Sequence, residues 1–137
     1  MAESDGWLIR LRLTVRFRDC DPYGHVNNAV YLTYLENARF ALWHAQDVRG
    51  VILARAEVDY RAQVKYGDRI EVRARLAGFG RTSFKYEYEI ADLATGAVVL
   101  EARTVQVKFD YEQQQPMLLS DDVKARLSQP VEASWQN

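Results

Sequence analysis

The chain has 137 residues, of which 48% are hydrophobic, with 18 Lys+Arg against 19 Asp+Glu and one cysteine. This length predicts a single domain, one cysteine excludes an internal disulfide framework, and a net charge of −1 argues against nucleic-acid or anionic-membrane partners. No apolar run approaches the roughly 20 residues of a membrane span, and the polar N-terminus is unlike a secretory signal, so we expect a soluble cytoplasmic protein.

The first predicted element is a strand over residues 11–17, where apolar and polar side chains alternate. Its expected buried face carries Leu11, Leu13, Val15 and Phe17. After a polar segment, residues 28–46 contain no Gly or Pro, and apolar side chains recur at steps of three and four from Tyr31 to Ala45. That spacing predicts one long helix, with Asn27 or Asn28 as N-cap and Gly50 as a stop signal beyond it.

Four more strands are predicted after the helix, over residues 54–62, 70–76, 84–90 and about 98–109, because each again alternates with a period of two. The apolar positions of the last strand change parity, which predicts a bulge near Arg103 and Thr104. A short helix is expected after Ser120, and residues after Pro130 are expected to be loose.

These elements together predict an α+β fold, in which a five-stranded antiparallel sheet wraps around one long helix and a short C-terminal helix follows. The short turns between the last four strands indicate an antiparallel meander. Such a sheet has two exposed edges, and a second copy of the chain could cover one of them. We therefore expect dimerisation.

The densest polar chemistry lies in residues 18–28, directly before the long helix. This segment holds two carboxylates, a thiol, an imidazole and two amides, namely Asp19, Asp21, Cys20, His25, Asn27 and Asn28. Helix starts present unpaired backbone N–H groups that favour a developing oxyanion. A purely structural interpretation is also open, because residues 21–24 fit a type I turn and an asparagine could simply cap the helix.

Residues 19–28, followed by Tyr31, Tyr34, Glu36, Ala38 and Arg39, resemble the active-site segment of hotdog-fold thioesterases. The resemblance is closest to the 4-hydroxybenzoyl-CoA thioesterase-like acyl-CoA thioesterases and extends from Leu8 to Leu127, so the expected domain is residues 1–137 with a core at about 8–128. It implies a hotdog fold, an acyl-CoA substrate and no cofactor. It also implies dimers, often stacked into homotetramers, with sites at the dimer interface.

The same resemblance implies that Asp21, not Asp19, is the catalytic carboxylate, and that the backbone N–H at or near Asn28 polarises the thioester carbonyl. A thiolate leaving group has a pKa near 8.5 and needs little help from a general acid. Asp21 could attack the carbonyl directly or activate water, and both routes stay open. His25 could orient the carboxylate or contact the thioester, or be only a loop histidine.

Other residues carry secondary expectations. The resemblance places coenzyme A contacts at the turn that holds Arg81 and Thr82, with Arg81 as the main candidate. Tyr31 could line the acyl pocket, although an aromatic residue on the apolar stripe is more often core. Glu36 could assist water, but we favour an i,i+3 ion pair with Arg39.

Several rival interpretations remain. Cys20 is disfavoured as a nucleophile because strand alternation turns it away from Asp21. A metal site made by Asp19, Asp21, His25 and His44 lacks a recognisable ligand spacing. A hydratase or dehydratase of acyl thioesters, or a non-catalytic protein that binds them, is the alternative function on the same fold.

Overall fold

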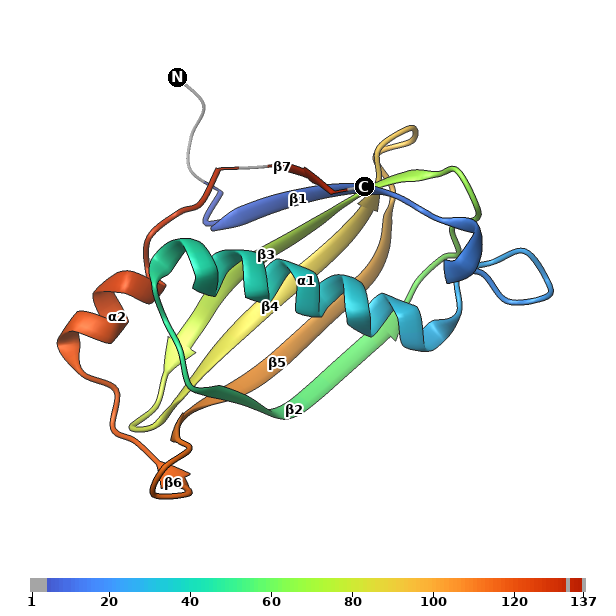
Figure 1. The fold of residues 1–137 in the computed structure, drawn as a ribbon. Helices are drawn as coiled ribbons and strands as arrows, with labels where there is room; N and C mark the ends of the chain where they lie inside the picture. Colours follow the sequence, from blue (N-terminus) through green and yellow to red (C-terminus); the bar gives the residue numbers. More distant parts are fainter. Residues whose placement is uncertain (1–4, 133, 137) are drawn as a thin grey trace.

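One curved sheet and the long helix that crosses it make up most of the molecule (Figure 1). The computed structural model describes residues 5–132 and 134–136. Its elements in chain order are β1 (Ile9–Thr14), the 3₁₀ helix η1 (Phe17–Asp19), α1 (Asn28–Gln46), β2 (Val51–Tyr60), β3 (Arg69–Phe79), β4 (Ser83–Asp92), β5 (Val98–Asp110), β6 (Gln115–Pro116), α2 (Asp121–Leu127) and β7 (Ser134–Gln136). Among the described residues, no helix combines the length and apolar character that crossing a membrane requires.

The long helix begins and ends where local chemistry dictates. Asn27 is the N-cap, and its side-chain oxygen accepts the Ala29 N–H at 2.9 Å. The helix ends at Gln46, and Asp47 follows in the left-handed conformation (φ 55°). The predicted helix is thereby confirmed, and Asn27 rather than Asn28 is its cap. Gly50 (φ 67°) lies further on, where its α-carbon packs so closely on β5 that a Cβ would stand 2.7 Å from the Phe109 carbonyl oxygen.

The sheet has the strand order β2-β5-β4-β3-β1, with every neighbouring pair antiparallel, which confirms the predicted five-stranded sheet. The short helix α2, capped by Ser120, is also confirmed. Two predictions at the ends of elements are wrong. β1 stops at Thr14, and Phe17 lies in η1 with 79% of its surface exposed. Residues beyond Pro130 are not all loose, because β7 pairs in parallel with β1 and covers that edge of the sheet.

The predicted bulge at Arg103 and Thr104 is wrong. Both residues pair regularly with β4, and the irregularity of β5 falls between the partners of Ile90 and Ala91 instead. Thr104 and Gln106 continue the buried face of β5 although they are polar. They are tolerated because the Thr104 hydroxyl shares a hydrogen bond with Tyr88 at 2.5 Å, and the Gln106 amide donates to the Phe84 carbonyl at 3.1 Å.

β2 is the opposite edge of the sheet and is exposed along most of its length. α1 packs on β3 and β1 and buries Tyr31, Tyr34, Leu35, Ala38 and Leu42 against the sheet. The inner face of β2, by contrast, leaves Leu53 and Tyr60 about half exposed. Among the described residues, β2 is therefore an edge strand with one unpaired backbone side, and its side chains Leu53 and Tyr60 are only half covered.

Candidate active site

Asp21 lies at the first position of a tight turn that its own carboxylate helps to build. The Gly24 N–H donates to the Asp21 carbonyl at 3.0 Å, and Gly24 adopts a φ of 86° that suits glycine. Asp21 Oδ1 accepts the backbone N–H groups of Tyr23 at 2.9 Å and His25 at 3.3 Å. Oδ2 accepts no hydrogen bond within the described part of the protomer. The turn interpretation is confirmed, and the same turn holds one carboxylate oxygen while leaving the other available.

The turn is anchored to the rest of the fold on both sides. The Val26 N–H donates to the Val64 carbonyl at 2.9 Å, and the Asn27 N–H donates to the Asp19 carbonyl at 2.9 Å. Isolated β-bridges join Cys20 to Val26 and His25 to Lys65. The carboxylate of Asp21 thus extends from a loop whose base is fixed by backbone hydrogen bonds.

The first turn of α1 supplies the donor side of the site. The N–H of Ala29 is satisfied by the Asn27 cap, whereas the N–H of Asn28 has no partner in the described residues of the protomer. The Asn28 carbonyl accepts the Tyr60 hydroxyl at 2.9 Å. A free N–H at a helix start carries partial positive charge and suits an oxyanion.

Tyr60 was not singled out by the sequence, because it is 32 residues from Asn28 along the chain. Its ring also packs edge-on against Tyr31, with centroids 5.6 Å apart. The end of the edge strand β2 therefore contacts the start of α1. No local spacing signals this contact, since it depends on how the sheet wraps around the helix.

Asp19 has a different environment from Asp21, two residues away. Asp19 is buried, and it accepts hydrogen bonds from the Tyr34 hydroxyl at 2.7 Å, the Arg16 guanidinium at 3.1 Å and the Arg16 N–H at 3.0 Å. Burial alone would raise the pKa of the Asp19 carboxyl, but these bonds outweigh it and hold the pKa below its ordinary value. Burial and the Asp19 carboxylate together raise the pKa of Tyr34. Asp19 is thus a structural carboxylate with its acceptors occupied.

The remaining predicted site residues are dispersed in one protomer. His25 is exposed, and its imidazole makes no hydrogen bond or ion pair with the described residues. Tyr31 is 3% exposed, and its hydroxyl accepts the Val64 N–H at 3.3 Å, so in the single chain it belongs to the core. Burial raises the pKa of Tyr31 and keeps it neutral. Arg81 and Thr82 lie in the β3–β4 turn, at the opposite end of α1 from Asn28 (Figure 1). The structure does not bring Arg81 and Thr82 to Asp21 within one protomer.

The predicted ion pair between Glu36 and Arg39 is wrong. Glu36 is exposed, while Arg39 is 5% exposed and its Nη1 donates to the Tyr88 hydroxyl at 3.3 Å. The signal for this burial is in the sequence, because Arg39 follows the core residue Leu35 by four positions and so shares its helix face. The position of Arg39 on the buried face of the helix prevents the expected ion pair with the exposed Glu36.

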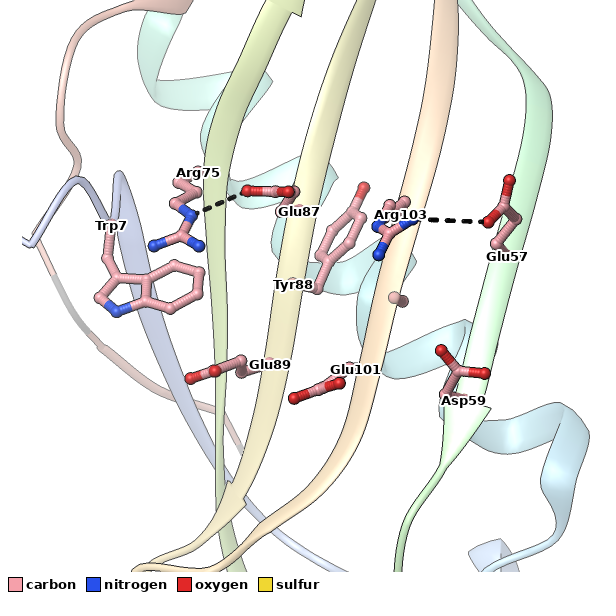
Figure 2. Close-up of a pocket in the computed structure, with 10 residues that line it drawn as sticks. Trp7, Glu57, Asp59, Arg75, Glu87, Tyr88, Glu89, Glu101 and Arg103 are labelled. Atoms are coloured by element: carbon pink, nitrogen blue, oxygen red, sulfur yellow. Dashed lines mark hydrogen bonds and ion pairs between the residues drawn. The ribbon is translucent and has the colours of Figure 1, made fainter.

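Five cavities on the described surface lie away from Asp21. One, of about 170 Å³, opens on the face of the sheet away from α1 (Figure 2). Five carboxylates line it, from Glu57, Asp59, Glu87, Glu89 and Glu101. Arg75 pairs with Glu87 at 3.1 Å, Arg103 with Glu57 at 3.9 Å and Arg73 with Glu89 at 3.1 Å. Arg61 pairs with Glu101 at 3.2 Å and with Asp59 at 3.8 Å, so each of the five carboxylates has an arginine partner. Asp21, His25 and Asn28 line neither this cavity nor four others on the described surface. Residues 22–25 and 27–29, on either side of Val26, are exposed, so the segment around Asp21 is an open surface in one protomer.

No cluster of three or more metal-ligating side chains occurs among residues 5–132 and 134–136. Cys20 is partly buried, and its sulfur lies 3.7 Å from the Arg16 carbonyl oxygen. Three polar groups in this region can still form hydrogen bonds and take part in chemistry. They are the Asp21 carboxylate, the His25 imidazole and the Asn28 N–H.

Solved structures with the same fold include two proteins named as thioesterases. A thioesterase from Thermus thermophilus, solved with coenzyme A and Zn, is 34% identical, with a TM-score of 0.80 over 89% of this chain and 98% of that one. The 1,4-dihydroxy-2-naphthoyl-CoA thioesterase Slr0204 from Synechocystis shares the fold at 18% identity, with a TM-score of 0.78 over 86% and 93% of the two chains. The expected hotdog fold is thereby confirmed.

Two curated relatives fall between these two structures in sequence identity. The long-chain acyl-CoA thioesterase FadM of Escherichia coli (strain K12) is 25% identical over 131 residues, which span 90% of this chain and 99% of that protein. The chloroplastic acyl-acyl carrier protein thioesterase ATL3 of Arabidopsis thaliana is 25% identical over 125 residues, and the match spans 85% of this chain but 65% of that longer relative. A model of the thioesterase-like superfamily matches residues 15–127. The chain is therefore a member of the thioesterase-like superfamily.

Proposed function

We propose that this protein hydrolyses an acyl-CoA thioester to a free carboxylic acid and coenzyme A. The observation that carries the proposal is the free Oδ2 of Asp21 on a loop joined directly to a helix start with a free N–H at Asn28. One group can attack or activate water, and the other can stabilise the oxyanion that results. Relatives named as acyl-CoA thioesterases support the same activity.

Asp21 acts from a preorganised position. Two backbone N–H groups hold its Oδ1, so the carboxylate loses little freedom when substrate binds. Either Oδ2 attacks the thioester carbonyl and displaces the thiolate to give an anhydride, which water then hydrolyses to free the acid and Asp21, or it removes a proton from water that attacks instead. In both routes the carbonyl oxygen gains negative charge beside the Asn28 N–H, and the thiolate leaves without needing a strong acid.

The proposed site needs a second copy of the chain. β2 is an edge strand with one unpaired side, and it carries the exposed side chains Leu53 and Tyr60. Leu32 and Phe40 of α1 are exposed as well. Pairing of two β2 edges would satisfy their backbone groups and cover these apolar side chains. Since Tyr60 contacts Asn28, the same pairing would turn the open surface near Asp21 into a cleft.

A homodimer or a dimer of dimers also gives Arg81 and Thr82 a role. These residues are remote from Asp21 in their own protomer, so we propose that they contact the coenzyme A moiety bound at another copy's site. Arg81 is exposed and has no ion-pair partner in the described structure, which leaves its guanidinium free for phosphate.

The test is free-thiol release from short, long and aromatic acyl-CoAs, with hydration of an enoyl-CoA measured in parallel. Asp21→Asn should lower kcat by about 10²- to 10⁴-fold, whereas Asn28→Ala, which keeps the backbone donor, should lower it less. Asp122→Asn, on exposed helix α2, is the matched control and should keep wild-type kcat. A folded Asp21→Asn protein with wild-type kcat would refute the role of Asp21. Enoyl hydration without thiol release from any substrate would refute the hydrolase.

A further inference from the structure

Arg39 is a buried cation to which no step of the proposed reaction assigns a role. It lies in the middle of α1 and is 5% exposed. Its Nη1 donates to the Tyr88 hydroxyl at 3.3 Å, and that hydroxyl shares a 2.5 Å hydrogen bond with Thr104 Oγ1. No carboxylate of the described residues lies within ion-pair distance of its guanidinium. The charge is therefore buried without a counter-ion.

This arrangement is unfavourable in the isolated protomer. Charged side chains are almost never fully buried unless paired, and a guanidinium offers five N–H donors of which Tyr88 accepts one. Among the described residues, two side-chain polar atoms are fully buried without a hydrogen-bond partner, Gln46 Oε1 and Gln106 Oε1. No nitrogen of Arg39 belongs to this set. Nε and Nη2 also lack a partner among the described residues, so neither nitrogen is completely closed off from solvent. This unoccupied Nε–Nη2 edge is the one that pairs with a carboxylate through two parallel hydrogen bonds.

The cluster of Arg39, Tyr88 and Thr104 lies at the border of the covered part of the sheet. Thr104 on β5 pairs with Ala56 on the edge strand β2, and Ala56 is exposed. The inner face of β2 on this side is otherwise apolar, with Leu53 and Val58 as neighbours along the strand. A chain of methylene groups would find hydrophobic contacts there, and the guanidinium is the exception within that surface.

We propose that Arg39 binds a carboxylate at the far end of the acyl chain, which makes the enzyme selective for acyl-CoAs whose acyl group ends in a second carboxylate. The inference rests on the proposed function, because it assumes that the thioester lies at Asn28 and the acyl chain runs along α1 beside β2. Arg39 follows Asn28 by 11 residues on the same helix, or about 16 Å along its axis. A short acyl group does not span that distance, whereas a medium or long one does.

Tyr88 has a positioning role in this proposal. The Tyr88 hydroxyl accepts from Arg39 and shares a hydrogen bond with the Thr104 hydroxyl, in which either oxygen can donate, and the pair fixes one side of the guanidinium. Burial raises the pKa of Tyr88, so the hydroxyl stays neutral and does not itself neutralise Arg39. The positive charge is thus left for the ligand.

The experiment compares ligands of equal chain length that differ only at the far end. Dodecanedioyl-CoA, dodecanoyl-CoA and 12-hydroxydodecanoyl-CoA, with the matching 8-, 10- and 14-carbon series, are titrated by calorimetry into the Asp21→Asn protein, and kcat/KM is measured with wild type. The two-carboxylate ligand should bind about 10- to 100-fold more tightly than its plain partner at the best-fitting length. Arg39→Met should remove that ratio, while Arg49→Met, at an exposed arginine, should keep it.

Each outcome decides the inference. Equal binding of the three ligands, or preference for the hydroxyl, overturns it, even if plain acyl-CoAs are hydrolysed and the proposed function stands. A two-carboxylate preference lost in Arg39→Met supports it, even if no thioester is hydrolysed and the proposed function fails. If the Arg39→Met protein keeps the affinity ratio between the two-carboxylate and the plain ligand but its oligomer dissociates, the guanidinium contacts a second copy of the chain, and the inference is overturned. If Arg39→Met does not fold, Tyr88→Phe replaces it, with a smaller loss of the ratio supporting the inference and an unchanged ratio overturning it.

Discussion

Replacement of Asp19 by Asn tests whether this carboxylate stabilises the loop that carries the site. Asn preserves the shape of the side chain but removes its charge. Asp19 Oδ2 accepts from the Tyr34 hydroxyl and the Arg16 N–H, and Oδ1 accepts from the Arg16 guanidinium. In the Asp19→Asn protein the new amide oxygen would keep the first two bonds as neutral ones, and the amide NH₂ would face the guanidinium, which would turn toward water.

The expected loss follows from those three bonds. Changing a hydrogen bond to a charged group into a neutral one costs about 1 kcal/mol, and two such bonds change. The Arg16 guanidinium is about half exposed, so its pairing contributes up to about 1 kcal/mol. The free energy of unfolding should therefore fall by about 2–3 kcal/mol, which for a domain of this size lowers Tm by roughly 10 °C.

Urea unfolding at pH 7, followed by circular dichroism, measures this loss, and Asp21→Asn is the internal control. Asp21 accepts only two N–H groups of its own exposed turn, and Asn is also favoured in such turns. We expect Asp21→Asn to cost less than about 1 kcal/mol. An Asp19→Asn protein as stable as wild type, or less affected than Asp21→Asn, would contradict the assignment of Asp19 as the structural carboxylate.

Three further predictions concern stability. Asn27→Ala, which removes the N-cap bond to Ala29, should lower the free energy of unfolding by about 1 kcal/mol in urea titrations. Gly50→Ala should lower it by more than about 1–2 kcal/mol, because the new Cβ combines a positive φ with the close approach to Phe109. Hydrogen bonds from three arginines hold the pKa of buried Glu71 below its ordinary value despite burial, so its stabilisation is present above about pH 4.3 and is lost as pH falls through the folded-state pKa. Glu71→Gln should therefore lose less stability than wild type on acidification below that pH.

Each of these has a control. Asn27→Asp keeps the cap and should stay near wild type. Gly96→Ala introduces a Cβ at a similar φ with no atom within 4 Å, so a loss as large as that of Gly50→Ala would rule out the clash with Phe109. For Glu71, thermal unfolding from about pH 5 down to about pH 2.5, a range that brackets the ordinary glutamate pKa, is compared with Glu112→Gln in an exposed turn. Parallel curves for wild type and Glu71→Gln would contradict the stated direction of the Glu71 pKa.

The sequence alone determined the elements whose cause is local. α1 follows from apolar spacing and from an asparagine that can accept an N–H two residues on, and the turn at Asp21 follows from the order Asp, Pro, Tyr, Gly. The strands follow from alternation of side chains. In each case the interacting groups lie within a few residues, so their spacing in the chain already sets their spacing in space.

Tertiary structure decided which polar side chains are buried. Asp19 is structural because Tyr34 reaches it, and Thr104 continues a buried face because Tyr88 pairs with it. The helix position of Arg39 indicates its burial, but its acceptor, Tyr88, is 49 residues away in sequence and is brought to it only by the fold. A polar residue is accepted in a core only where a partner from another element meets its hydrogen-bonding groups. Because the fold brings those partners together from remote segments, local pattern could predict the elements but not the hydrogen bonds between them.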